Sequence, residues 1–309
     1  MMIVTMISLK QITYALAVAD TLHFKKASEQ CFISQSALST AIVEMEKRLG
    51  FQLFERDNKK VFITPVGKEF LARAKQIKVQ INDLYRLGES LKEPLSYPLS
   101  LGVIPTIGPY LIPKVLPEIR KQYPNLQLRI VEEQSHVLVD MVKNAEIDTA
   151  ILALPYDIKG LLAYEFWQED FFWITHKKNL PMPKEEVSSQ ELKDSHLMLL
   201  REGHCLKDHV LSACKMQSHE SNVSLESTSL NMLVHMVSAR MGTTLIPEIA
   251  IDQLLQGNPE LKAIHLHEPG PHRRLAFIAR PNYTGISNIE LLKQVIIQRL
   301  SSGIVDLAS

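Results

Sequence analysis

The first fifty residues carry apolar side chains at intervals of three and four in three short segments. This spacing predicts helices over Leu9–Thr21, residues 23–32 and residues 35–50, the last ending in a glycine cap. Only Ile33 and Ser34 separate the second segment from the third, and Ser34 can cap the helix that follows. Two helices joined by so tight a turn are typical of a helix-turn-helix, whose second helix enters the major groove of DNA. A helical hairpin of another kind is the alternative.

Residues 53–65 form two short apolar runs around a polar turn, which predicts a two-stranded wing after the third helix. Small polar side chains at the start of the third helix let the backbone approach phosphates, and a glutamine there can read a base edge. Cationic side chains on the wing suit the phosphate backbone. The residues predicted to contact DNA are Ser34, Gln35, Ser36, Ser39, Thr40, Arg56, Lys59 and Lys60.

From Thr64 the apolar positions keep helical spacing as far as Leu91, which predicts one long helix with a narrow apolar seam. A seam of this length requires a partner helix, so we expect the chain to dimerise through it. Pro94 and Pro98 end the helix and predict a hinge.

After the hinge, strand-like segments alternate with helical ones. We expect strands at residues 99–104, 126–131, 148–153, 197–200 and 243–247, and helices at residues 109–122, 135–144 and 229–240. Such alternation argues for parallel sheets with helices against their faces. The predicted fold class is therefore α/β, preceded by a winged helix-turn-helix and a long linker helix.

Charge and hydropathy narrow the classes of function. The chain is neutral overall, yet residues 1–93 hold 14 basic and 10 acidic side chains, whereas residues 94–309 hold 20 and 24. A mildly basic N-terminal third is consistent with a nucleic-acid-binding module. The first nine residues lack the basic start of a signal peptide, and no run of about 18 apolar residues is present. We therefore expect a cytoplasmic protein without a membrane span.

The segment 203–214 holds two of the three cysteines and is the candidate for chemistry. Cys205 has His204 beside it and Lys207 two residues later, and cations beside a thiol favour the reactive thiolate. Asp208 lies within one helical turn of Cys205 and could handle a proton. These neighbours favour a redox or catalytic role for Cys205 over a static disulfide, which is rare in cytosolic proteins.

The separation of Cys205 and Cys214 indicates what pairing them would require. If the segment is helical, about 13–14 Å separates their Cα positions, whereas a disulfide requires about 4.4–6.8 Å. Bond formation would then require the helix to unravel, as in a switch. Two buried cysteines in an ordinary helix remain the alternative.

A zinc site is a further alternative for this region. Its ligands would be His204, Cys205, His209, Cys214 and His219. Their spacing fits no common zinc arrangement, so we expect neither a metal nor another cofactor.

The segment HFKKASEQCFISQSALSTAIVEMEKRLGFQLFER, with FITPVG after it, resembles the N-terminal domain of LysR-type transcriptional regulators. Met45 stands where the family usually has leucine, a change that conserves volume. The resemblance implies paired linker helices and, through further effector-domain contacts, a dimer of dimers. The implied domains are a winged helix-turn-helix domain at 7–64 (helix-turn-helix 24–43), a linker helix and hinge at 65–96, and an effector domain at 97–309. The effector domain is expected to be similar to periplasmic binding proteins. Its subdomain I would lie near 97–167 and 273–309, and its subdomain II near 168–272.

Within that family, GVIPTIGPYLIP, EGHCLKDHVLSAC and STSLNMLVHMVSARMGTTLIP resemble the peroxide-sensing activators, and the likeness covers essentially the whole chain. It implies that Cys205 reacts with hydrogen peroxide and that Cys214 resolves the product as a reversible disulfide. Arg274 is an alternative to Arg273 in the pocket, because the local register is one residue off. The residues implied to hold peroxide and move its protons are Thr106, His204, Asp208 and Arg273.

The function implied is that of a DNA-binding activator of the oxidative-stress response, not an enzyme. The implied partners are double-stranded promoter DNA, hydrogen peroxide, RNA polymerase, a glutaredoxin- or thioredoxin-type reductant and further copies of the chain, with no membrane. Two alternatives remain open. One is a LysR-type regulator that senses a small metabolite and has incidental cysteines. The other is a cysteine-nucleophile enzyme or thiol peroxidase, which would leave the helix-turn-helix unexplained.

Overall fold

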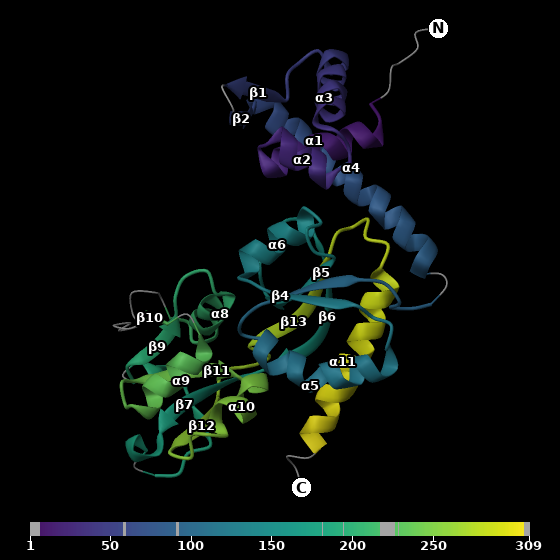
Figure 1. Cartoon of the computed structure of the whole chain (residues 1–309). Helices are drawn as coiled ribbons and strands as arrows, with labels where there is room; N and C mark the ends of the chain where they lie inside the picture. The colour runs from purple at the N-terminus through teal and green to yellow at the C-terminus, as the bar shows by residue number, and fades with distance from the viewer. Residues whose placement is uncertain are drawn as a thin grey trace. The chain divides into compact units, whose positions relative to one another are not determined.

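The computed structural model describes residues 7–57, 60–90, 93–180, 182–193, 195–216, 226–227 and 229–305. Contacts within the chain separate two units, residues 1–88 and residues 89–309 (Figure 1). The first is helical with a small wing, and the second mixes helices with two sheets. The predicted fold class is therefore confirmed.

Three short helices build the first unit: α1 (Leu9–Thr21), α2 (Phe24–Gln30) and α3 (Gln35–Leu49). Ser34 caps α3, because its hydroxyl oxygen accepts a hydrogen bond from the Ala37 amide at 3.2 Å. Gly50 ends α3 in the left-handed conformation, at φ 76°. The apolar faces of the helices meet in one core that includes Ala15, Val18, Ala27, Leu38, Ile42 and Met45.

A two-stranded wing follows α3. Strands β1 (Phe54–Asp57) and β2 (Lys60–Ile63) pair antiparallel. Glu46 fixes the wing to α3, because its carboxylate oxygen Oε1 accepts the backbone amides of Leu53 at 2.8 Å and Phe54 at 3.1 Å. The orientation of the wing relative to α3 is thus set by a charge-assisted contact.

The helix α4 (Pro65–Ser90) follows the wing. Its first residue is a proline, which is well placed at a helix start because the first amides have no acceptor within the helix. Thr64 assists this start by accepting the Gly67 amide at 2.9 Å. Along α4, Val66, Ile77 and Leu84 are exposed in the single chain.

The second unit contains two sheets with helices against them (Figure 1). The first sheet has the strand order β4 (Leu128–Glu132), β3 (Leu99–Val103), β5 (Thr149–Leu154), β13 (Arg273–Ala279) and β6 (Leu162–Glu169). The helices α5 (Gly108–Gln122) and α11 (Ile286–Val305) pack beside Leu101 on one face. The helix α6 (Ser135–Lys143) packs beside Gly102 on the other face, because successive side chains of a strand point to opposite sides.

The strands of the second sheet come between β6 and β13 of the first sheet in the sequence. Its strand order is β10 (Glu226–Ser227), β9 (Leu197–Leu200), β11 (Thr243–Pro247), β7 (Phe171–His176), β12 (Leu261–Leu266) and β8 (Glu186–Val187). The helical segments around it are η1 (Lys177–Asn179), α7 (Ser189–Leu192), α8 (Cys205–Ala213), α9 (Leu230–Ser238), η2 (Glu248–Ala250) and α10 (Ile251–Leu255). One continuous apolar core joins the two sheets.

Two connections carry the chain between the sheets. Residues 169–171 lead from β6 to β7, and residues 267–272 lead from β12 back to β13. They lie side by side, because the Phe171 amide donates to His272 Nδ1 at 2.9 Å and the His272 amide donates to the Glu169 carbonyl at 3.1 Å.

The expectation of parallel sheets is wrong in one respect. Strand β3 is parallel to β4 and β5, but the returning strand β13 is antiparallel to both β5 and β6. In the second sheet β7 is likewise antiparallel to β11 and β12. Strands β7 and β13 each follow a crossover from the other sheet. Their direction is therefore not set by the local alternation of strand and helix.

Candidate functional site

The reactive-cysteine candidate lies at the first position of α8. Gly203 precedes it at φ +94°, in the left-handed region, and a Cβ there would meet Gln134 Oε1 at 2.6 Å. Only glycine fits this turn without strain. His204 then adopts an extended N-cap conformation, and Cys205 begins the helix. A thiol at a helix N-terminus faces unpaired backbone amides, which favour the thiolate.

Burial opposes this effect. Cys205 is 3% exposed, and burial raises the pKa of its thiol. The Ser135 hydroxyl, the Arg273 charge and the Ala153 backbone lower the pKa in turn, while the Asp208 charge raises it. The Ser135 oxygen has no conventional hydrogen-bond partner among the described residues, so its polar contact is with this sulfur. In this conformation Cys205 is a protonated thiol beside groups that can stabilise its anion.

One of the two cations that the sequence indicated beside Cys205 is not charged in the structure. His204 is buried, and burial together with the Arg201 charge lowers its pKa, so its ring is neutral at pH 7. The charge that stabilises the Cys205 anion is that of Arg273. The expectation that His204 supplies a cation to Cys205 is therefore wrong, although the two residues are adjacent.

Arg273 and Thr106 meet at the carboxyl ends of the first-sheet strands. Thr106 lies in the turn between β3 and α5, and its hydroxyl accepts from Arg273 Nη1 at 3.2 Å. The Thr106 carbonyl accepts from Arg273 Nη2 at 3.2 Å. Ser135 and Ala153 reach the same place from the ends of β4 and β5. Ligand sites in open α/β sheets form at this edge.

The alternation of side chains along β13 separates the two candidate arginines. Arg273 is fully buried, whereas the next residue, Arg274, points outward and binds Glu165 at 2.8 Å. Arg273 therefore points into the interior of the fold and Arg274 lies on the surface.

Glu169 is a member of the site that sequence reasoning missed. Its Oε1 accepts from Arg273 Nε at 2.7 Å and lies 2.6 Å from Arg273 Nη2. Its Oε2 accepts the Ile249 amide at 2.9 Å. A buried arginine requires a buried carboxylate, so the need for a partner was predictable, but nothing in the sequence marked Glu169 as that partner.

The remaining predicted residues of the sensor take different positions. Asp208 is exposed on the first turn of α8, where its charge acts on both Cys205 and Tyr156. Cys214 is the C-cap of α8 and is buried, and burial and the Glu268 charge raise its pKa to about 12. Both cysteines are free thiols at opposite ends of the helix.

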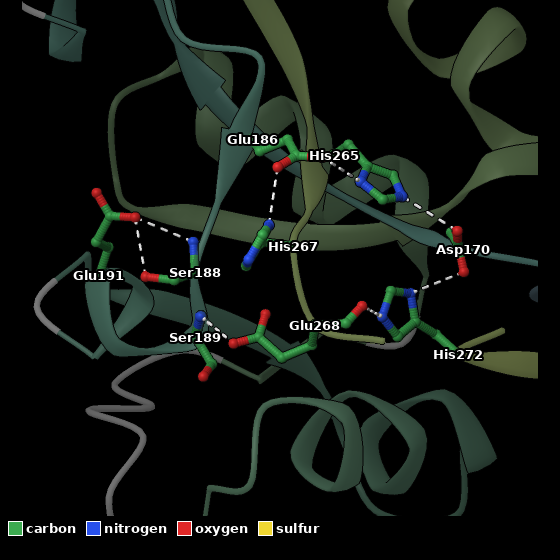
Figure 2. Close-up of polar contacts among 9 residues, drawn as sticks. All are labelled: Asp170, Glu186, Ser188, Ser189, Glu191, His265, His267, Glu268 and His272. Atoms are coloured by element: carbon green, nitrogen blue, oxygen red, sulfur yellow. Dashed lines mark hydrogen bonds and ion pairs between the residues drawn. The ribbon is translucent and has the colours of Figure 1, made fainter. Parts of the chain in front are cut away.

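The returning crossover belongs to a polar cluster of histidine, carboxylate and serine side chains (Figure 2). His272, which precedes Arg273, accepts the Phe171 amide at Nδ1 and donates from Nε2 to the Glu268 carbonyl at 2.9 Å. The Glu268 carboxylate, whose charge acts on Cys214, accepts the Ser189 amide at 2.7 Å. One short connection thus positions the arginine near Cys205 and the carboxylate near Cys214.

The same cluster reaches the surface through two further histidines. Asp170 lies 3.1 Å from His265 Nε2 and 3.2 Å from His272 Nδ1. Glu186 lies 2.8 Å from His267 Nδ1. Figure 2 shows how these contacts join β8 and β12 to the first crossover. Among the described residues no three such side chains are grouped so as to hold a metal ion, and His219 of the zinc alternative lies outside them.

The predicted DNA-contacting residues lie on the first unit. Ser34 is the N-cap of α3, and Ser36 and Thr40 are exposed. The Arg56 guanidinium lies 4.1 Å from the centre of the Phe24 ring and donates to the Ser39 hydroxyl at 3.0 Å.

A hollow of about 390 Å³ opens beside this contact. Its polar lining residues are His23, Lys25, Gln35, Ser39, Arg56 and Lys60. The structure thus groups four predicted residues with His23 and Lys25, which the sequence analysis did not select. Lys59 lies outside the described residues.

The comparisons with known proteins agree on one family. The model described as bacterial regulatory helix-turn-helix protein, lysR family, matches residues 9–68, and the LysR substrate binding domain matches residues 92–301. The HTH-type transcriptional regulator EstR of Acinetobacter baylyi is 39% identical over 293 residues, covering 94% of this chain and 96% of EstR. A probable hydrogen peroxide-inducible genes activator of Streptomyces viridosporus is 34% identical, covering 88% of both chains.

A solved structure extends the comparison to the whole fold. A full-length OxyR variant from Pseudomonas aeruginosa is 31% identical, with a TM-score of 0.77 over 94% of this chain and 98% of that one. None of the helices in the described ranges is long and apolar enough to cross a membrane.

Proposed function

Because this chain belongs to the LysR family of bacterial transcriptional regulators, we propose that it switches transcription in response to hydrogen peroxide through a reversible Cys205–Cys214 disulfide. The family consists of regulators rather than enzymes, so the thiol-peroxidase alternative falls away. The observation that carries the proposal is the setting of Cys205: a buried thiol at a helix N-terminus, facing Ser135 and Arg273.

The first step is attack of the Cys205 sulfur on one peroxide oxygen. The O–O bond breaks as the S–O bond forms, the thiol proton is released, and the departing hydroxide gains a proton to leave as water. Arg273 and the Thr106 hydroxyl orient peroxide beside the sulfur. Neutral His204 and the Asp208 carboxylate can accept the thiol proton. Because burial favours the protonated thiol, these groups have to remove the thiol proton as peroxide enters.

The second step is attack of Cys214 on the sulfenic acid, which forms the disulfide and releases a second water. The helix between the cysteines keeps them about 13–14 Å apart, so α8 has to leave its helical path first. The energy for this rearrangement comes from the exergonic reaction with peroxide. A glutaredoxin- or thioredoxin-type dithiol would return the switch to the reduced state.

The output is DNA binding by an assembled regulator. The α4 side chains Ile77 and Leu84 are exposed in the single chain, and an apolar seam on so long a helix favours a paired linker. We expect a dimer through α4 and a dimer of dimers through effector contacts. The hollow lined by Gln35 and Lys60 would face promoter DNA, and the oxidised assembly would recruit RNA polymerase.

The decisive experiment traps the sulfenic acid. Peroxide-treated Cys214→Ser protein should react with a dimedone-type reagent at Cys205, whereas Cys205→Ser should lose both the labelling and the transcriptional response. Cys31 provides the control, because it lies in the other unit: Cys31→Ser should respond as wild type. Dimedone on Cys31, or a full peroxide response in Cys205→Ser, would contradict the mechanism.

A second candidate function is supported by the EstR match, whose name mentions no peroxide. In that case the chain senses a small metabolite and its cysteines are incidental. Induction by a metabolite would then persist in the Cys205→Ser and Cys214→Ser proteins. A non-reducing peptide map after stoichiometric peroxide separates the two functions, because only the redox switch yields a Cys205–Cys214 peptide.

A further inference from the structure

His209 connects the reactive helix to the other subdomain. It lies one turn after Cys205 on α8, and its Nε2 is 2.8 Å from the carbonyl oxygen of Pro155, which follows β5 of the first sheet. The ring is 3% exposed. A second polar contact of this kind, between His204 Nε2 and Gln134 Nε2, is longer, at 3.5 Å. The hydrogen bond of His209 is therefore the stronger of these two polar contacts between the α8 region and the first-sheet region.

The partners of the His209 ring define its charge state. A carbonyl oxygen only accepts hydrogen bonds, so Nε2 carries the proton and Nδ1 carries a lone pair. Nδ1 is buried and has no hydrogen-bond partner among the described residues. Burial lowers the pKa of His209, and the Arg273 charge lowers it further, while the Pro155 carbonyl and the Asp208 charge raise it. The ring is thus neutral in this conformation, with one nitrogen well bonded and the other unsatisfied.

We propose that His209 is a positioning residue whose hydrogen bond to Pro155 holds α8 closed over Cys205 in the reduced protein, and whose protonation releases the helix. The role in switching rests on the proposed function. Closure of α8 places the Cys205 sulfur against Ser135 and the Ala153 backbone, and disulfide formation requires α8 to leave that position. The His209–Pro155 bond is one of the contacts that then has to break.

The sign of the pH effect follows from proton linkage. A released His209 faces water and takes up a proton below its ordinary pKa of about 6.5, whereas burial in the closed form lowers the pKa of the ring. The closed form is therefore fully favoured above that pH and loses stability as the pH falls through it. Release through this residue should therefore increase between pH 8 and pH 5.5, by about tenfold at most, a limit set by protonation of the released form.

The test measures release in the fully reduced protein without peroxide. N-ethylmaleimide labels Cys205 only when α8 opens. At each pH, the protection factor is the labelling rate of the protein unfolded in urea divided by the labelling rate of the native protein. In His209→Ala the Pro155 carbonyl loses its donor and a cavity replaces the ring, so protection at pH 8 should fall by about tenfold or more.

Two further variants separate a specific role from a merely structural one. In His209→Gln the side-chain amide can still donate to Pro155 but takes up no proton. Its protection should match that of the wild type at pH 8 and should lack the loss at pH 5.5 that His209 contributes. His235→Gln on α9 is the matched control, because His235 is an exposed histidine, and it should keep the wild-type pH profile.

The outcomes decide the proposal independently of the peroxide chemistry. Wild-type protection in His209→Ala, or an undiminished pH response in His209→Gln, would overturn it. If His209→Ala fails to fold, the pH profile of His209→Gln still decides. In a protein that forms the disulfide, a tenfold loss of closure should make the midpoint potential about 30 mV more negative. Absence of any disulfide would refute the proposed function but leave the labelling result valid.

Discussion

The Glu169–Arg273 ion pair offers the sharpest test of the sensor geometry. Both side chains have 0% exposure, and Glu169 receives two guanidinium contacts at 2.6–2.7 Å. In Glu169→Gln the Arg273 charge stays buried without a counter-ion. Breaking a buried pair from one side costs about 3–5 kcal/mol, which corresponds to a fall in Tm of about 6–20 °C for a unit of this size.

The chain provides a matched control on the same two strands. Glu165 and Arg274 also pair between β6 and β13, at 2.8 Å, but their side chains are 41% and 42% exposed. Such a surface pair contributes about 0–1 kcal/mol, so Glu165→Gln should be nearly neutral. The distance is similar in both pairs, but only the Glu169–Arg273 pair is buried.

Urea unfolding followed by tryptophan fluorescence measures the difference. The chain has two tryptophans, Trp167 on β6 and Trp173 on β7, which flank Glu169 on either side of the crossover. The signal therefore reports the second unit alone. An effect of about 3–5 kcal/mol exceeds the uncertainty of linear extrapolation, which is about 10–15% of the total.

A double variant checks the cause. Glu169→Gln combined with Arg273→Met removes the unpaired charge, so it should recover stability relative to Glu169→Gln alone. If Glu169→Gln cost no more than Glu165→Gln, or if the double variant recovered nothing, burial of the pair would not be the source of the effect.

Three further outcomes are expected. Lys60→Ala should weaken binding to all DNA sequences and reduce the slope of log affinity against log salt concentration by about one, whereas Gln35→Ala should relax base preference. Titration of labelled duplexes measures both effects, and an unchanged slope in Lys60→Ala would mean that Lys60 does not contact DNA. Ile77→Asp with Leu84→Asp should shift the light-scattering mass towards a monomer at micromolar concentration, and a retained oligomer would mean that assembly does not depend on α4. Gly203→Ala should speed alkylation of Cys205 in reduced protein, because a Cβ meets Gln134 and φ +94° is strained, and a wild-type rate would show that the turn adapts.

Several features of this protein were readable in the sequence, because they depend on residues close together in the chain. The helices α1 to α4 follow from apolar spacing, and the ends of α3 follow from Ser34 and Gly50. In each case the period of a helix and the chemistry of its caps act within a few residues, so no tertiary information is needed.

The grouping of the candidate site residues depended on contacts between distant parts of the chain. Arg273 meets Thr106 across 167 residues and Glu169 across 104. The antiparallel insertion of β13 decides that Arg273 points inward and Arg274 outward, and a slip of one residue would exchange them.

Charge state was also decided by the tertiary structure. The sequence indicated a cation at His204, but both His204 and His209 are buried, and burial lowers the pKa of each. Burial raises the pKa of the Cys205 thiol, and the groups that lower it, Ser135 and Arg273, are far from it in sequence. Spacing along the chain predicts which groups are present, whereas desolvation depends on what covers them, and only the packed fold determines that.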